Sequence, residues 1–127
     1  MDKKILLVDD DYDVREYMRV ILETKNYKTL QAENIRDAEG IIKNENIDLI
    51  ILDVMMEKDS DGFTFAQKIR SDNKYKSIPI IMVTSVNEKT GFKFDKDSDG
   101  AFLPVDAFIE KPVNAEKILA EIDKLIN

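Results

Sequence analysis

Four short apolar runs, each followed by polar side chains, constrain the fold of this chain more than any other feature of its sequence. The run at 49–52 has the length and the β-branched content of a buried strand, and Asp53 follows it directly. The carboxyl ends of parallel strands meet at one edge of a sheet, so the polar groups that follow such runs are expected to lie together. The other three runs and their polar groups are 5–8 with Asp9, Asp10 and Asp11, 80–83 with Thr84 and Ser85, and 107–109 with Lys111.

Segments with a helical period alternate with these runs. Apolar and polar residues alternate at 28–33, which indicates an edge strand, whereas 87–105 has no period and is predicted to be irregular and extended. Helices are predicted at about 11–25, around 38–42 with Gly40 inside a weak or closely packed helix, from about Phe63 onward, and around 118–126. The alternation predicts an α/β fold, a doubly wound five-stranded parallel sheet in the order 2-1-3-4-5, with the irregular segment between strands 4 and 5.

Length and composition narrow the chemistry that the chain can perform. At 127 residues it is predicted to be one domain, 1–127. It has no cysteine and no histidine, which excludes disulfides, thiol nucleophiles, the usual zinc site and imidazole bases. A net charge of -7 without a dense basic run argues against nucleic-acid and membrane partners, and the first apolar run is too short for a signal peptide or a membrane span. We therefore expect a cytoplasmic protein that uses carboxylates, hydroxyls and lysine.

The acidic groups predicted at the sheet edge need a positive partner. Two unit charges about 4 Å apart repel by roughly 4 kcal/mol at an effective dielectric near 20, so Asp9, Asp10 and Asp53 together oppose folding. A hard divalent cation with oxygen ligands, most simply Mg²⁺, would relieve this repulsion, and Lys111 supplies a second cation. Such a centre suits a transferring phosphoryl group, with Asp53 as the acceptor and Thr84 as a hydroxyl donor to its oxygens.

Each of these residues also fits an ordinary structural role when it is taken alone. An aspartate after a strand is often a helix N-cap, a threonine a turn residue, and a lysine before a proline a solvated side chain. Their occurrence together, at the ends of successive predicted strands, favours a site.

Four motifs in a fixed order carry a family resemblance, namely 5–10 with its acidic pair, 49–53, 82–85 and 108–113. With them the sequence resembles the receiver domain of bacterial two-component response regulators, which has a flavodoxin-like fold, and the resemblance covers essentially the whole chain. It implies that Asp53 accepts a phosphoryl group from a sensor histidine kinase or a histidine phosphotransfer protein. It also implies a signalling protein and not an enzyme.

The resemblance assigns a role to each residue of the predicted site. The implied ligands of Mg²⁺ are Asp10 and Asp53 directly, Asp9 through a water, and Met55 through its backbone carbonyl. Thr84 and Lys111 would contact the phosphoryl oxygens, and Thr84 with Phe108 would form a switch that alters a partner-binding surface. The implied partner is an unknown downstream protein or output domain, and the resemblance also allows a homodimer that depends on phosphorylation.

The stretch behind Asp53 departs from the family pattern, with Glu57 where a proline is usual and Gly62 one place later than the usual glycine. In receivers, the side chains two places beyond the acceptor and two beyond the threonine flank the path of the hydrolytic water. Here these are Met55 and Val86, which can neither take a proton nor hold a water well. Slow loss of the phosphoryl group is expected.

Two other functions fit parts of the sequence. A haloacid-dehalogenase-like Mg-dependent phosphatase also has a strand followed by an Asp-x-Asp pair, which Asp9 and Asp11 would supply, but it needs a further acidic cluster that is missing after Lys111. The spacing of an EF-hand calcium loop fits 95–106 through its glycine, but Asp106 stands where a bidentate glutamate is needed. A solvated acidic turn is the favoured interpretation of that loop.

Overall fold

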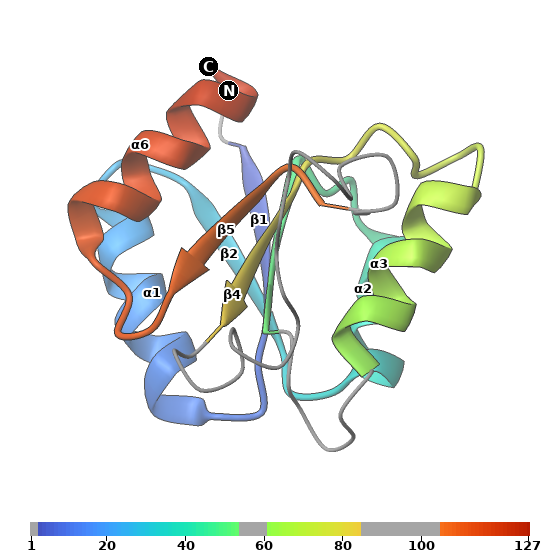
Figure 1. The fold of residues 1–127 in the computed structure, drawn as a ribbon, viewed down its shortest axis with the longest axis horizontal. Coiled ribbons are helices and arrows are strands. Elements are labelled where there is room, and N and C mark those ends of the chain that lie inside the picture. Colours follow the sequence, from blue (N-terminus) through green and yellow to red (C-terminus); the bar gives the residue numbers. More distant parts are fainter. Residues whose placement is uncertain (1–2, 54–60, 85–104) are drawn as a thin grey trace, which may run out of the picture.

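Five parallel strands form one sheet in the order β2-β1-β3-β4-β5 (Figure 1). The computed structural model describes residues 3–53, 61–84 and 105–127. The strands are β1 (Lys4–Val8), β2 (Lys28–Ala32), β3 (Leu49–Asp53), β4 (Ile80–Thr84) and β5 (Ala107–Glu110), and each pairs in parallel with its neighbours. The predicted doubly wound sheet and its order are confirmed. The segment predicted to be irregular, 87–105, lies outside the described residues except for its last position.

The described helices cover both faces of this sheet. They are α1 (Tyr12–Glu23), α2 (Ile35–Asn44), α3 (Asp61–Ser71) and α6 (Ala115–Ile126). In Figure 1, α1 and α6 lie on one side of the strands, and α2 and α3 lie on the other. No helix within the described ranges is long and apolar enough to cross a membrane.

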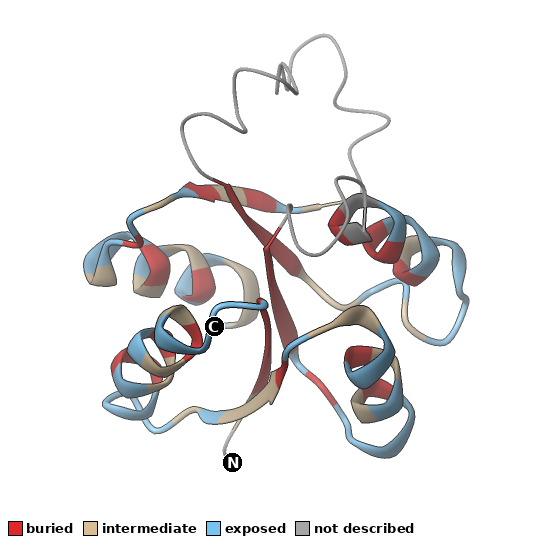
Figure 2. Ribbon diagram, turned by 90° about the horizontal axis from the view of Figure 1, so that it is seen from below, coloured by how far each residue is buried: buried red, intermediate tan, exposed pale blue. Residues whose placement is uncertain are grey.

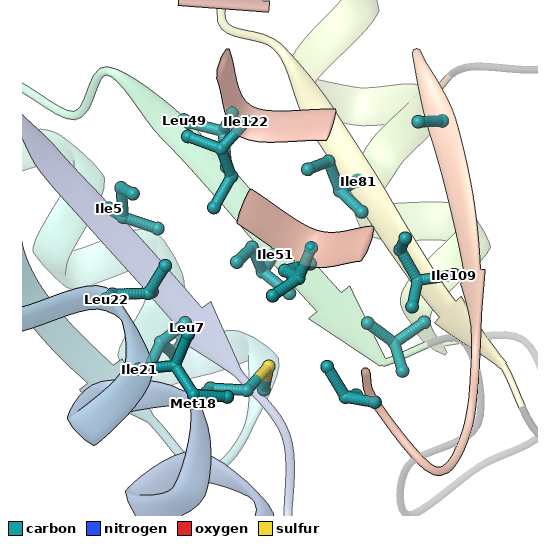
Figure 3. Packing of buried hydrophobic residues seen from close by; sticks show 14 residues of the cluster. Ile5, Leu7, Met18, Ile21, Leu22, Leu49, Ile51, Ile81, Ile109 and Ile122 are labelled. Carbon is teal, nitrogen blue, oxygen red and sulfur yellow. The ribbon is translucent and has the colours of Figure 1, made fainter. Parts of the chain in front are cut away.

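Alternate residues of the strands face the two layers of helices, so the core consists of two clusters. Every residue of β3 and β4 is buried, which Figure 2 shows as red ribbon through the middle of the molecule. This explains why these strands appear in the sequence as continuous apolar runs. Figure 3 shows the cluster between the sheet and α1 and α6, with Ile5, Leu7, Leu49, Ile51, Ile81 and Ile109 from strands, Met18, Ile21 and Leu22 from α1, and Ile122 from α6.

The first helix is shorter than the predicted 11–25 because side chains and backbone define both of its ends. Asp11 is the N-cap, and its carboxylate accepts hydrogen bonds from the N–H groups of Asp13 and Val14. At the other end Asn26 has a φ of 67°, a left-handed conformation that ends the helical path. The carboxylate of Asp11 is therefore committed to a cap.

The second and third helices also differ in detail from prediction. A Cβ added to the exposed Gly40 would meet nothing within 4 Å, so close packing does not explain that glycine. The third helix begins at Asp61, slightly before the predicted start near Phe63. Strand β2 lies at the edge of the sheet, as its alternating pattern predicts.

Candidate metal centre

Three carboxylates meet at the carboxyl edge of the sheet. Val8 and Leu52 are partners in the β1–β3 ladder, which brings the next residues, Asp9 and Asp53, side by side. Asp9 is 1% exposed and Asp53 is 2% exposed, whereas Asp10 is exposed. One oxygen from each of the three carboxylates lies within 4.8 Å of the others. The pocket therefore holds a high density of negative charge, most of it shielded from water.

Lys111 points its ammonium group into this pocket. Its Nζ lies 3.4 Å from Asp9 Oδ2 and 3.6 Å from Asp53 Oδ2, and its side chain is only 25% exposed. The backbone N–H of Lys111 donates to the carbonyl oxygen of Thr84 at 2.7 Å, which extends the β4–β5 pairing beyond the end of β5. Lys111 precedes Pro112 through a cis peptide bond. The alternative interpretation of Lys111 as a solvated side chain is thus wrong, because its ammonium group is paired with two buried carboxylates.

The donor atoms of the pocket suit a hard divalent cation. Asp9 Oδ1 accepts the N–H of Asp11 at 2.8 Å, but within the described residues the buried Oδ2 accepts no hydrogen bond. Burial raises the pKa of the Asp9 carboxyl above its ordinary value of 3.8, although the N–H of Asp11 and the charge of Lys111 act in the opposite direction. A buried carboxylate oxygen of this kind is a ready ligand for Mg²⁺, because the cation prefers oxygen and would compensate the charge.

Thr84 and Phe108 lie on the two strands beside the pocket. Thr84 is the last residue of β4, is 1% exposed and follows Val83, the ladder partner of Asp53. Phe108 is the ladder partner of Met82, and its half-buried ring packs against the cluster under α2 and α3. The structure therefore brings Asp9, Asp10, Asp53, Thr84 and Lys111 to one edge, with Phe108 inside the adjoining strand.

Met55, Glu57 and Val86 lie outside the described residues, so the predicted carbonyl ligand and the two apolar side chains of the water path stay predictions.

Reasoning from the sequence missed Arg15, a buried arginine close to the pocket. It is 8% exposed, and its guanidinium Nη1 donates to the backbone carbonyl of Asp9. A signal was present, since Arg15 stands three places before Met18 and seven before Leu22, on the inner stripe of α1.

Asp106 is engaged in the fold and is not a spare ligand. Its Oδ2 accepts the backbone N–H of Ile80 at 2.8 Å and also pairs with the guanidinium of Arg70. Arg70 in turn donates to the carbonyl oxygen of Ile78 at 2.6 Å. This network supports a structural role for Asp106, while the other residues of the candidate calcium loop, at 95–100, lie outside the described residues.

The sheet, with an acidic pocket, a lysine and a threonine at its carboxyl edge, defines a class of flavodoxin-like signalling domains. The sequence profile of the response regulator receiver domain matches residues 5–123. The chain belongs to this family, which confirms the resemblance.

Individual relatives agree with this membership. The chain is 34% identical to the phosphate regulon transcriptional regulatory protein PhoB of Pseudomonas aeruginosa, covering 98% of this chain and 52% of that protein. It is 33% identical to the regulatory protein VanR of Enterococcus faecium, and the match covers 96% of this chain and 49% of that protein. The chain thus spans about half the length of these relatives.

Solved structures show the same fold. The chemotaxis protein CheY4 of Vibrio cholerae superposes with a TM-score of 0.83 at 28% identity, covering 98% of this chain and 99% of that one. A two-component response regulator from Clostridium difficile superposes with a TM-score of 0.80 at 29% identity, covering 98% and 95%. The comparisons give no support to the haloacid-dehalogenase alternative. Asp11, the second aspartate of the Asp-x-Asp pair, instead caps α1, where its Oδ1 accepts the N–H groups of Asp13 and Val14.

Proposed function

We propose that this receiver accepts a phosphoryl group on Asp53, in a reaction that depends on Mg²⁺, from the phosphohistidine of a sensor histidine kinase or a histidine phosphotransfer protein. One observation carries the proposal. Asp53 ends a fully buried strand, one of its oxygens lies within 4.8 Å of an oxygen of Asp9 and of Asp10, and its Oδ2 is 3.6 Å from Lys111 Nζ. Asp9 shares the partner carboxylates and the lysine, but its Oδ1 already accepts the N–H of Asp11 and it follows β1 instead of ending a strand that is buried throughout.

The transfer exchanges one bond to phosphorus for another. A carboxylate oxygen of Asp53 attacks phosphorus, the bond from phosphorus to the donor's imidazole nitrogen breaks, and that nitrogen keeps the electron pair. Lys111 would neutralise the phosphoryl oxygens, and the Thr84 hydroxyl would donate to one of them; the closeness of Lys111 to Asp53 and the position of Thr84 at the end of β4 support these roles. Asp9, Asp10 and Asp53, with the carbonyl of Met55, would hold Mg²⁺, which supplies further charge neutralisation when bound.

Phosphorylation would then act on a partner surface through Thr84 and Phe108. If the Thr84 hydroxyl turns towards the phosphoryl group, it vacates space beside β5, and the ring of Phe108 can turn inward. The partner would be a downstream protein or an output domain, and a homodimer that depends on phosphorylation is a further form of the same switch. The relatives named above are about twice as long as this chain, and PhoB is named a transcriptional regulatory protein, which is consistent with such an output.

Chemical phosphorylation tests the acceptor directly. The protein is incubated with Mg²⁺ and acetyl phosphate, and its intact mass is measured. The wild type and Asp123→Asn, a matched change of an exposed aspartate on α6, should each gain one phosphoryl increment, whereas Asp53→Asn should gain none. A full increment on Asp53→Asn would show that the acceptor is a different residue.

A further inference from the structure

Arg15 connects three elements next to the acidic pocket. From α1 its Nη1 donates to the carbonyl oxygen of Asp9, just past the end of β1, and its Nε donates to Gln31 Oε1 on β2 at 2.9 Å. The side chain is 8% exposed, and burying an arginine is costly unless its donors are satisfied. The cost of burying this guanidinium must therefore be offset by the interactions that it makes.

The surroundings hold the guanidinium in one orientation. The amide of Gln31 is fixed from its other side, because its Nε2 donates to Glu16 Oε2 at 2.7 Å. Glu16 is itself paired with Arg19 at 3.0 Å. The ring of Tyr12 lies 5.7 Å from the guanidinium carbon of Arg15, within the range of a cation–π contact. Arg15 is thus a preorganised donor aimed at one backbone oxygen.

The oxygen that Arg15 holds belongs to the peptide that links Asp9 to Asp10. Holding this peptide restricts ψ of Asp9 and φ of Asp10, which limits the directions in which the two side chains leave the backbone. Asp10 depends on this most, because within the described residues its carboxylate takes part in no hydrogen bond or ion pair. Arg15 also binds a carbonyl and not a carboxylate, so it leaves the carboxylate oxygens of the pocket available for a cation.

We propose that Arg15 is a positioning residue for the divalent-cation site, acting through the Asp9–Asp10 peptide. The inference rests on the proposed function, and it extends the site to the inner face of α1 and to Gln31. Its charge alone would have the opposite effect, since a nearby cation repels Mg²⁺. Geometry and charge therefore predict opposite signs for the effect of removing Arg15 on Mg²⁺ affinity.

Calorimetric titration with Mg²⁺ alone separates the two effects. Arg15→Met keeps the length of the side chain but loses its donors, and it should weaken Mg²⁺ binding about 10-fold, the lower end of the range for residues that orient metal ligands. Arg15→Lys keeps the charge but cannot donate to Asp9 and Gln31 together, so its affinity should be intermediate. Unchanged or tighter binding by Arg15→Met would overturn the proposal.

Two controls separate positioning from general stability. Arg36→Met removes an exposed arginine of α2 that lies outside the network around Arg15, and Ile122→Val weakens the core beneath α6. Both should keep the Mg²⁺ affinity of the wild type. If Arg15→Met does not fold, Gln31→Met decides the question, because it removes the second anchor of Arg15 without a change of charge. Wild-type affinity in Gln31→Met would then overturn the proposal.

The Mg²⁺-binding experiment can contradict the role of Arg15 without contradicting the proposed function, and the reverse also holds. Mg²⁺ binding needs no phosphoryl transfer, whereas the mass increment on Asp53 tests that transfer in the wild type. If both hold, Arg15→Met should raise the Mg²⁺ concentration for half-maximal phosphorylation by acetyl phosphate, and saturating Mg²⁺ should restore most of the maximal rate. A lower maximal rate with an unchanged half-saturation would contradict a role through the cation site.

Discussion

Lys111 Nζ lies 3.4 Å from Asp9 Oδ2, a buried oxygen that accepts no hydrogen bond within the described residues. Lys111 supplies positive charge directly to the carboxylates of the pocket in the absence of a metal ion. Lys111 also lies 3.6 Å from Asp53 Oδ2, so a single ammonium group serves two buried carboxylates. The balance between one lysine and three acids determines how the empty and the metal-bound states differ.

Removing the lysine should make the protein more dependent on Mg²⁺. In Lys111→Met the carboxylates lose their cation, so the metal-free protein should lose stability by roughly 1–3 kcal/mol. The increase in melting temperature on adding Mg²⁺ should exceed that of the wild type, because the ion relieves more repulsion. Thermal unfolding with EDTA and with Mg²⁺ measures both quantities. A smaller Mg²⁺ effect than in the wild type would contradict this account of the pocket.

Removing one acid should have the reverse effect. Asp10→Ala deletes a charge of the repelling cluster, so the melting temperature of the metal-free protein should rise or stay level, and most of the stabilisation by Mg²⁺ should disappear. The control is Asp123→Ala, a change of an exposed aspartate on α6. Asp48→Ala would not serve, because the Asp48 carboxylate accepts a hydrogen bond from the backbone N–H of Lys4. Full Mg²⁺ stabilisation in Asp10→Ala would exclude Asp10 as a ligand.

Arg70 should matter for stability and not for metal binding. Its pairing with Asp106 and its bond to the Ile78 carbonyl join the end of α3 to the starts of β4 and β5. Arg70→Met should lower the free energy of unfolding, measured in urea, by roughly 1–3 kcal/mol.

Ca²⁺ should stabilise neither the wild type nor Arg70→Met. Calcium stabilisation of the wild type that Asp106→Asn abolishes would revive the calcium loop at 95–106.

The network on α1 predicts a pH dependence. Hydrogen bonds from Arg19, and then from Gln31, lower the pKa of Glu16 below its ordinary value of 4.5. A lowered pKa stabilises the fold above pH 4.5, and this contribution is lost as the pH falls through the native pKa. The difference in unfolding free energy between the wild type and Glu16→Gln should therefore be largest at neutral pH and shrink in acid. A difference independent of pH would contradict the ion-pair origin.

The lifetime of the phosphoryl group offers a prediction from sequence alone. Met55 and Val86 are apolar where the family places the side chains that flank the hydrolytic water, so phospho-Asp53 should decay slowly. The double variant Met55→Asn with Val86→Glu should lose the group faster, measured as the decay of the phosphorylated mass. Equal or slower decay in the double variant would show that these positions do not control hydrolysis here.

The sequence predicted the strands better than the helix ends, for a physical reason. A strand covered on both faces must be apolar throughout, so β3 and β4 stand out as unbroken runs that end at the site. Helix boundaries depend on single side-chain contacts such as the cap at Asp11, which a periodic pattern does not reveal.

Arg15 was missed for a related reason. A long charged side chain on the inner stripe of a helix usually extends to solvent along the apolar surface. Whether it is buried instead depends on a partner from elsewhere in the chain, here Gln31 and the Asp9 carbonyl. Such a partner becomes visible only when β2 is placed beside β1.

The pairing of β4 with β5 has a consequence for the charge in the pocket. Asp106 and Ile80 exchange two hydrogen bonds of 2.8 Å at the start of this ladder, one through a backbone carbonyl and one through a carboxylate. If β5 slipped by one residue, every side chain would turn to the opposite face, and Glu110 or Pro112 would occupy the place of Lys111. Either slip would take the ammonium group of Lys111 away from the acids, and the slip that brings in Glu110 would also add a fourth carboxylate. The contacts between Asp106 and Ile80, at the opposite end of β5, thus determine whether a positive or a negative side chain lies beside the carboxylates of the pocket.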